Sequence, residues 1–180
     1  PCNPTGSVFS EEELRVIAEV ISEHPQITIV SDEIYEYINF SGKPHFSIAQ
    51  FDFIKDQCVV VNGFSKGFAM TGWRLGYIAA PQWIADACIK MQGQFTSGAA
   101  SFTQKAAADA LLSDMTPTFK MTEEFHKRKK LFVSLLSEVP GFKVNNPSGA
   151  FYVFPDISFY FGKSNGEHKI NNADDFSDYM

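Results

Sequence analysis

The first pattern along the chain is helical. Behind a Ser-Glu-Glu-Glu capping box that begins at Ser10, apolar residues recur three or four positions apart: Leu14, Ile17, Ala18 and Ile21. We predict a helix from this point to about residue 24, where Pro25 ends it.

Three short apolar runs have the length of strands, at residues 27–30, 59–61 and 75–80, and the first two are rich in β-branched residues. The first two are unbroken, which is typical of parallel strands buried on both faces. Asp32 follows the first run, and a loop that contains Lys66 follows the second. Open α/β sheets bind ligands at the carboxyl ends of their strands, so both residues are candidates for a site.

Helical patterns predict a short helix near residues 48–51 and longer ones at 82–92, 102–113 and 117–139, with a polar, small-residue break at 94–101. The longest helix carries an apolar stripe that we interpret as core packing: Met121, Phe125, Phe132, Leu135, Leu136 and Val139.

After residue 139 we predict short strands at 142–144 and 150–154, an exposed polar loop at 162–172, and a helix from Asp174 onward. Strands that alternate with helices indicate an α/β sheet. We expect the long helix to connect this sheet to a smaller α+β unit.

The segment FSKGFAMTGWRLGY, residues 64–77, carries the clearest chemistry. A lysine in a loop is usually a solvated surface charge, but Lys66 stands among apolar residues and glycines. Lysine amines form Schiff bases with aldehydes, and a planar guanidinium such as that of Arg74 forks onto phosphate with two hydrogen bonds. An aldehyde that carries a phosphate, such as pyridoxal phosphate (PLP), matches this pair.

Bulk composition narrows the classes of protein. The 180 residues are 44% hydrophobic and 20% charged, which indicates a soluble globular protein. The net charge of −6 argues against nucleic acid as the main partner, and no apolar run is long enough to span a membrane. The three cysteines and four histidines lack metal-ligand spacing, so we expect no metal site and a reducing compartment, the cytoplasm.

Four motifs, taken in order, resemble the PLP-dependent aminotransferases of fold type I, class I/II. They are PCNPTG at 1–6, SDEIYEY at 31–37, NGFSKGFAMTGWRLGY at 62–77 and PSGAFYVFP at 147–155. The ordered set spans nearly the whole chain. Its GWRLG form is most similar to the aspartate and kynurenine aminotransferase branch.

The resemblance implies a role for each candidate residue. Lys66 forms the Schiff base with PLP and, once freed, moves the proton between substrate and cofactor. Arg74 binds the cofactor phosphate. Asp32 pairs with the pyridine nitrogen and favours its protonated, electron-accepting form. Asn3 and Tyr35 hydrogen-bond the ring hydroxyl oxygen.

One position departs from the family pattern. Many members carry a phosphate-binding serine three residues before the lysine, where this chain has Gly63. Ser65, directly before the lysine, is our candidate serine for cofactor binding. Simpler roles stay open for three of the others: Asp32 as a turn or helix cap, Tyr35 as a core residue, and Asn3 in an Asn-Pro turn.

The resemblance also implies an organisation into parts. Residues 1–116 are expected to be the C-terminal portion of a large PLP-binding domain with a mostly parallel sheet. Residues 117–139 form a linking helix, and residues 140–180 are part of a small α+β C-terminal domain. Family members continue beyond both ends of this chain. We therefore expect an internal piece of a longer, homodimeric enzyme, and no transamination by residues 1–180 alone.

The expected reaction is the transfer of an amino group between an amino acid, aspartate or a related one, and a 2-oxo acid. Two alternatives stay open. A PLP-dependent lyase of the same fold, of the carbon–sulfur β-lyase or aminocyclopropane carboxylate synthase type, shares every motif above. A non-catalytic, aminotransferase-like sensing domain is the other alternative.

Overall fold

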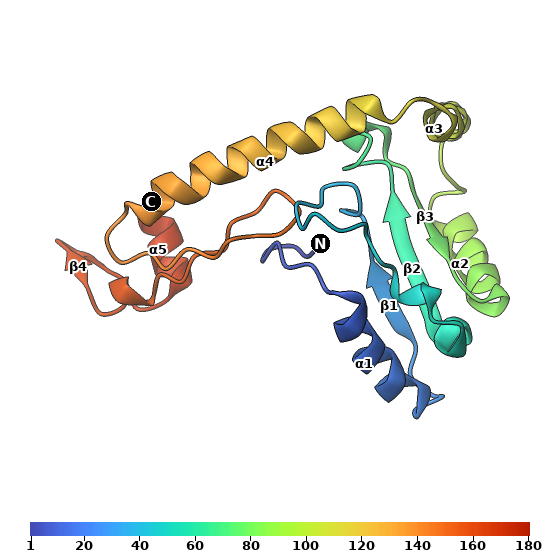
Figure 1. Cartoon of the computed structure of the whole chain (residues 1–180), viewed down its shortest axis with the longest axis horizontal. Helices are drawn as coiled ribbons and strands as arrows, with labels where there is room; N and C mark the ends of the chain where they lie inside the picture. The colour runs from blue at the N-terminus through green and yellow to red at the C-terminus, as the bar shows by residue number, and fades with distance from the viewer.

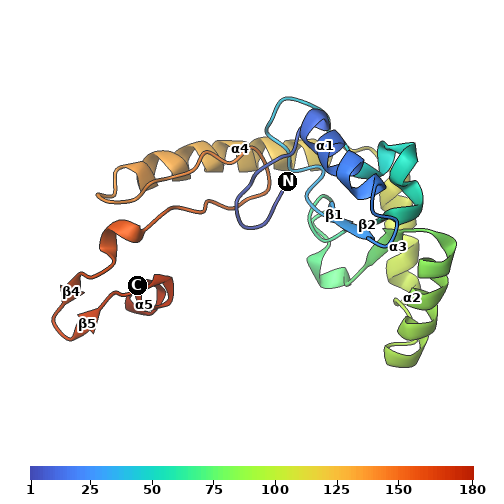
Figure 2. The same cartoon turned by 90° about the horizontal axis from the view of Figure 1, so that it is seen from below.

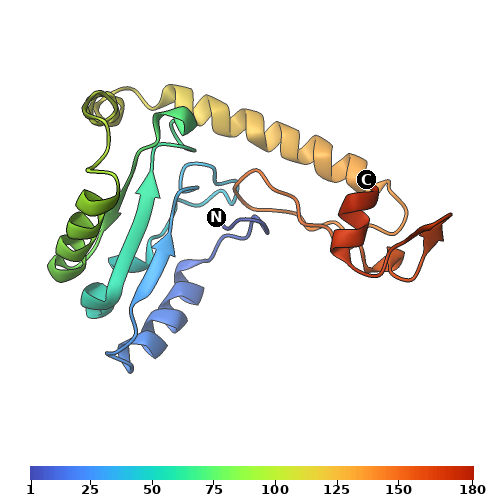
Figure 3. The same ribbon diagram turned by 180° about the vertical axis from the view of Figure 1, so that it is seen from behind.

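The computed structural model of residues 1–180 places a three-stranded sheet at one end of the molecule and the C-terminal residues at the other (Figures 1 and 3). Helix α4 (Thr116–Ser137) spans the distance between these two ends. The chain then returns toward the sheet, so that the Ser148 amide donates to the Gly6 carbonyl at 2.8 Å. Residues near 148 therefore lie beside the first residues of the chain.

The sheet confirms the predicted α/β class. Its strands in spatial order are β1 (Ile29–Asp32), β2 (Cys58–Gly63) and β3 (Gly76–Ala79). β1 and β2 run parallel, with Asp32 opposite Val61, whereas β2 and β3 run antiparallel, with Gly63 opposite Gly76. β2 is thus the central strand, and β1 and β3 form the two edges.

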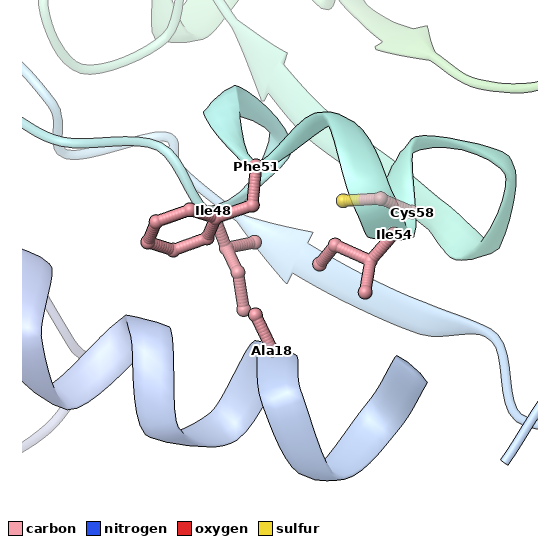
Figure 4. Packing of buried hydrophobic residues seen from close by; sticks show 5 residues of the cluster. All are labelled: Ala18, Ile48, Phe51, Ile54 and Cys58. Atoms are coloured by element: carbon pink, nitrogen blue, oxygen red, sulfur yellow. The ribbon is translucent and has the colours of Figure 1, made fainter. Parts of the chain in front are cut away.

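Helix α1 (Glu11–Ser22) packs beside the sheet together with the short 3-10 helices η1 (Ile48–Gln50) and η2 (Asp52–Gln57). The predicted capping box is present at Ser10. Figure 4 shows the core that joins these elements: Ala18, Ile48, Phe51, Ile54 and Cys58. Burying a large apolar side chain contributes about 1.5–3 kcal/mol, so this cluster holds α1 against the strands.

The first strand starts two residues later than predicted and is less buried. The Gln57 amide donates at 2.9–3.1 Å to three carbonyls, which holds the preceding segment in a turn: those of Ile21, His24 and Ile27. Only one face of β1 is covered, so Val30 is 64% exposed. The prediction of a strand buried on both faces is therefore wrong for β1 within this chain.

Helices α2 (Gln82–Phe95) and α3 (Ser101–Leu112) confirm the predicted pair. α2 stands beside β3 in Figure 1, and Figure 2 shows it at the end of the molecule opposite β4 and β5. α2 has no buried residue. None of the helices combines the length and the apolar composition that crossing a membrane requires.

The apolar stripe of α4 is core packing only in its first half. Met121 and Phe125 pack against a buried cluster around Tyr35, and the Thr122 hydroxyl donates to the Tyr37 carbonyl at 2.8 Å. Further along the stripe, Phe132 and Leu135 are about half exposed.

The predicted strands at 142–144 and 150–154 are wrong. Only isolated bridges form there, Lys143 to Asp156 and Asn39 to Gly149. Ala150 has a left-handed backbone (φ 56°), which an extended strand cannot contain. The backbone turns at Ala150 and does not continue as a strand.

The polar loop at 162–172 is exposed as predicted except at Ile170, which is buried, and it contains a small hairpin. Its strands are β4 (Ser164–Asn165) and β5 (His168–Lys169), joined through Gly166 with φ 64°. The sequence signal for such short strands is too weak to separate them from a loop. The last helix, α5 (Ala173–Tyr179), confirms the predicted C-terminal helix.

Candidate active site

Lys66 lies in a loop whose two ends are held together. The loop leaves β2 at Gly63 and enters β3 at Gly76, and these two glycines are opposite each other in the sheet. The Phe64 amide also donates to the Leu75 carbonyl at 3.2 Å. The lysine and the arginine eight residues later therefore belong to one closed loop.

Two glycines of this loop are required for close approach. A Cβ at Gly63 would lie 2.9 Å from the Gly76 Cα and 2.9 Å from the Leu75 carbonyl oxygen. A Cβ at Gly67 would lie 2.5 Å from Cδ2 of Tyr37. Contacts this short are repulsive, so the departure from serine at position 63 has a steric reason in this backbone.

The Lys66 amine is held against aromatic rings. Its Nζ lies 5.2 Å from the ring centroid of Phe151 and 5.7 Å from that of Tyr35. The side chain is half-buried and forms no ion pair. Cation–π contacts of this kind attract an ammonium group to the face of a ring without pairing it with a carboxylate, so the amine stays available to a ligand.

Tyr35 is 4% exposed, and its hydroxyl lies 2.5 Å from that of Tyr152. The Asn3 amide donates to the same Tyr152 hydroxyl at 3.3 Å. Burial is the largest cause that raises the pKa of Tyr35, and the negative charge of Asp32 adds to it. Its hydroxyl therefore keeps its proton at neutral pH and can donate it to an acceptor.

Asp32 is the last residue of β1 and is exposed. A carboxylate that pairs with a ring nitrogen is expected to be buried. Its Oδ1 accepts a hydrogen bond from the Ile34 amide at 3.2 Å, which is the turn-capping role left open above. Asp32 also lines a cavity of about 350 Å³ together with Asn3 and Tyr35. The capping contact uses one lone pair, so the carboxylate can serve both the turn and a ligand.

The phosphate candidates lie apart from this cavity. Arg74 is exposed, has a left-handed backbone (φ 52°) and donates from Nη1 to the Thr71 carbonyl at 2.9 Å. Ser65 is half-buried in the same loop. Neither residue lines the cavity, and no hydrogen bond joins either to Asp32 or Asn3. Lys66 does not line the cavity either. Asn3, Asp32 and Tyr35 share the cavity, and Lys66 contacts this group only through the ring of Tyr35.

Backbone strain concentrates around these residues. Four non-glycine residues have a positive φ, and three of them lie in the lysine loop or directly before Phe151: Ala69, Arg74 and Ala150. Such residues cost on the order of 1 kcal/mol each and cluster at functional sites. The strain therefore supports a functional role for both segments.

The sequence analysis missed a buried acid next to Asp32. Glu33 is 6% exposed and accepts hydrogen bonds from three side chains: Ser47 at 2.7 Å, His45 at 2.9 Å and Ser31 at 3.0 Å. Burial alone would raise the pKa of Glu33, but these hydrogen bonds outweigh it and hold the pKa below its ordinary value. The only signal in the sequence was the second acid of the SDEIYEY motif.

Tyr152 and Phe151 were quoted in a motif but given no role. Their placement depends on residues 147–152 returning to the sheet, which no local pattern predicts.

Asp32 lies at the carboxyl end of β1 and the lysine loop at the carboxyl end of the parallel strand β2, which is where open α/β sheets bind ligands. The chain belongs to the aminotransferase class I and II family, which matches residues 1–179.

Similar proteins carry names of the same kind. A bifunctional aspartate aminotransferase and glutamate/aspartate-prephenate aminotransferase of Petunia hybrida is 45% identical over 100% of this chain and 38% of its own length. An aspartate aminotransferase of Bacillus subtilis (strain 168) is 45% identical over 87% of this chain and 40% of its own.

Solved structures agree with these relatives. The aspartate aminotransferase from Rhizobium meliloti superposes with a TM-score of 0.94 at 34% identity, over 99% of this chain and 45% of that one. The chain spans about two fifths of the length of the curated relatives it matches.

Proposed function

We propose that this chain forms the lysine-bearing part of a PLP-dependent aminotransferase that moves an amino group between an amino acid and a 2-oxo acid. The observation that carries the proposal is the unpaired Lys66 amine, held against the rings of Tyr35 and Phe151 in a loop closed at both ends. The names of the relatives support aspartate as the first substrate to test. They favour amino transfer over the lyase and the sensing domain.

The residues present fit PLP by the chemistry of their groups. Lys66 offers an amine for the aldehyde, Asp32 a carboxylate for the pyridinium, and Asn3 and Tyr35 donors for the ring hydroxyl oxygen. Arg74 has guanidinium donors beyond the one given to Thr71, and forms no ion pair, which suits a phosphate. When bound, the cofactor supplies the electron-accepting ring for the reaction.

Each residue then has a task in the reaction. Lys66 anchors the cofactor and carries the proton to and from the substrate α-carbon, so it acts as base and acid in turn. Asp32 keeps the ring nitrogen protonated by charge pairing. Tyr35 donates its retained proton to the ring oxygen, and Arg74 with Ser65 holds the phosphate end.

Reduction with borohydride followed by peptide mapping tests the anchor. In the complete gene product, we expect the pyridoxyl group on Lys66 and none on Lys105, an exposed lysine of α3 that serves as the internal control. Lys66→Ala should lower turnover by several orders of magnitude. Labelling of another lysine, or turnover by Lys66→Ala near that of the unmodified protein, would contradict the assignment.

The finer organisation is part of the same proposal. We place residues 1–116 in the large cofactor domain, 117–139 in the linking helix and 140–180 in the small domain.

We also propose a cytoplasmic homodimer. Free Cys2, Cys58 and Cys88 support a reducing compartment, and exposed apolar residues of α2 and α3 support a subunit interface: Trp83, Ile89, Phe95 and Phe102. Light scattering that finds an active monomer at micromolar concentration would overturn the dimer.

A further inference from the structure

We propose that Tyr152 is a positioning residue of the cofactor site, and that its hydroxyl turns the proton of Tyr35 toward the ring hydroxyl oxygen of the bound cofactor. The inference rests on the proposed function, because it needs a ligand that presents such an oxygen. It assigns a role to a residue that the sequence analysis left without one.

Tyr152 connects the two residues proposed for the ring oxygen. Its hydroxyl lies 2.5 Å from that of Tyr35 and accepts from Asn3 Nδ2 at 3.3 Å. The rings of the two tyrosines meet edge to face at 81°, with centroids 5.7 Å apart. The three side chains therefore form one hydrogen-bonded chain beside the Lys66 amine.

The count of protons gives this chain a direction. An amide N–H can only donate, so the Tyr152 oxygen accepts from Asn3, and each hydroxyl carries a single proton. If Tyr35 donated to Tyr152, the Tyr152 proton would have no partner among these groups, and Tyr35 would have none left for a ligand. The order Asn3 to Tyr152 to Tyr35 gives the Tyr152 proton an acceptor inside the chain. It also leaves the Tyr35 proton free to donate outward, and linked bonds strengthen one another.

The backbone holds Tyr152 in place from two sides. The Gly149 amide donates to the Gly6 carbonyl at 2.9 Å, and the Ala150 amide donates to the Ile38 carbonyl at 2.8 Å. Ala150 is fully buried in a left-handed conformation, two residues before Tyr152. A strained residue that the surroundings fix so tightly is expected where a side chain must be aimed.

Tyr152→Phe tests the proposal because it removes only the hydroxyl. In the complete gene product, freed of cofactor, dissociation constants are measured by spectroscopic titration for PLP and for its 3-deoxy analogue, which lacks the ring hydroxyl. We expect the affinity for PLP to fall about threefold to tenfold, as for the loss of one hydrogen bond, and the affinity for the analogue to stay unchanged. Tyr160→Phe is the matched control, since its hydroxyl donates to the Pro140 carbonyl instead.

Equal weakening for both ligands would mean that Tyr152 merely supports the fold, and it would overturn the inference, as would no weakening at all. Adding Tyr152→Phe to Tyr35→Phe should change the preference for PLP no further, and an additive loss contradicts a shared chain. If Tyr152→Phe does not fold, difluorotyrosine placed at position 152 keeps the ring and makes its hydroxyl a stronger donor. PLP should then bind more tightly relative to the analogue, and an unchanged ratio overturns the inference.

The two proposals fail in different ways. If the unmodified protein binds neither ligand, the proposed function fails and takes this inference with it. If PLP is found on Lys66 and Tyr152→Phe behaves like Tyr160→Phe, only the role of Tyr152 is lost.

Discussion

Asp32 stands at the end of β1 with one hydrogen bond from the Ile34 amide and is otherwise open to solvent. If it pairs with a protonated ring nitrogen, its charge matters more than its shape. We expect Asp32→Ala in the complete gene product to lose about 100-fold or more in kcat, a loss of about 3 kcal/mol, and Asp32→Glu to lose far less.

Steady-state rates with a panel of amino acids and 2-oxo acids measure this effect. Asp56→Ala, at an exposed carboxylate of η2, is the control and should leave kcat unchanged. Near-normal transamination by Asp32→Ala would leave Asp32 with the turn cap alone.

The negative charge of the Glu33 carboxylate contributes to the stability of the folded protein. Its folded pKa is lowered below the ordinary 4.5, so the folded state favours the carboxylate more than the unfolded state does. The resulting stabilisation is complete above about pH 5 and is lost as the pH falls below 4.5. We expect Glu33→Gln to lower the free energy of unfolding by about 1–3 kcal/mol at pH 7 and by much less at pH 3.

Urea unfolding at the two pH values measures the difference. Glu19→Gln, at an exposed position of α1, is the control. A loss for Glu33→Gln that is the same at both pH values would mean that shape, and not charge, is responsible.

Among the elements, the loop between β2 and β3 needs a residue without a side chain at its first position, Gly63. A Cβ at Gly63 meets backbone atoms at 2.9 Å, whereas a Cβ at Gly72 meets nothing within 4 Å. We expect Gly63→Ser to destabilise the protein by about 1–3 kcal/mol, because backbone must shift to admit it, and Gly72→Ser to have little effect of this kind.

Thermal unfolding and PLP titration of both variants measure the effect. A Gly63→Ser variant that is as stable as the unmodified protein and binds PLP more tightly would show that the loop can relax and adopt the serine of other family members.

The elements that could be predicted from the sequence carry local signals. The capping box at Ser10 and the apolar run of β2 need no distant partner to be recognised. The left-handed Ala150 does need one, because carbonyls of Gly6 and Ile38 fix the backbone around it. The predicted strand at 150–154 was wrong for this reason.

The same distinction applies to the candidate site. Lys66 and Tyr35 were predicted from their motifs, and they do lie together. Glu33 was missed because its partners at positions 45 and 47 approach it only after the chain has folded. Tyr152 was missed for a related reason: its hydrogen-bond partner Asn3 lies 149 positions away.

At the scale of the whole molecule, the open edge of β1 and the exposed apolar side chains bear on the behaviour of residues 1–180 alone. Val30 is 64% exposed and Phe95 79% exposed, and unpaired strand edges promote association. We expect this piece, expressed by itself, to aggregate and not to transaminate, because positioning contributes about 7–11 kcal/mol to catalysis and most of it would be lost.

Activity assays with PLP on residues 1–180 and on the complete gene product, side by side, test this expectation, with sedimentation to follow aggregation. Comparable specific activity of the two would mean that these 180 residues already contain a complete site.

The distance along the chain between Asn3 and Tyr152 has a consequence for biosynthesis. A ribosome adds roughly 5–20 residues per second, so the 149 positions between these two residues separate their synthesis by about 7–30 seconds. During that interval the lysine loop is already synthesised, whereas Phe151, which contacts Lys66 in the folded protein, is not. Folding is also slower when contacts join residues that are far apart in the chain. The nascent chain therefore cannot bring Asn3 and Tyr152 together until translation has passed residue 152, and from the proposed function we expect cofactor capture to follow that moment.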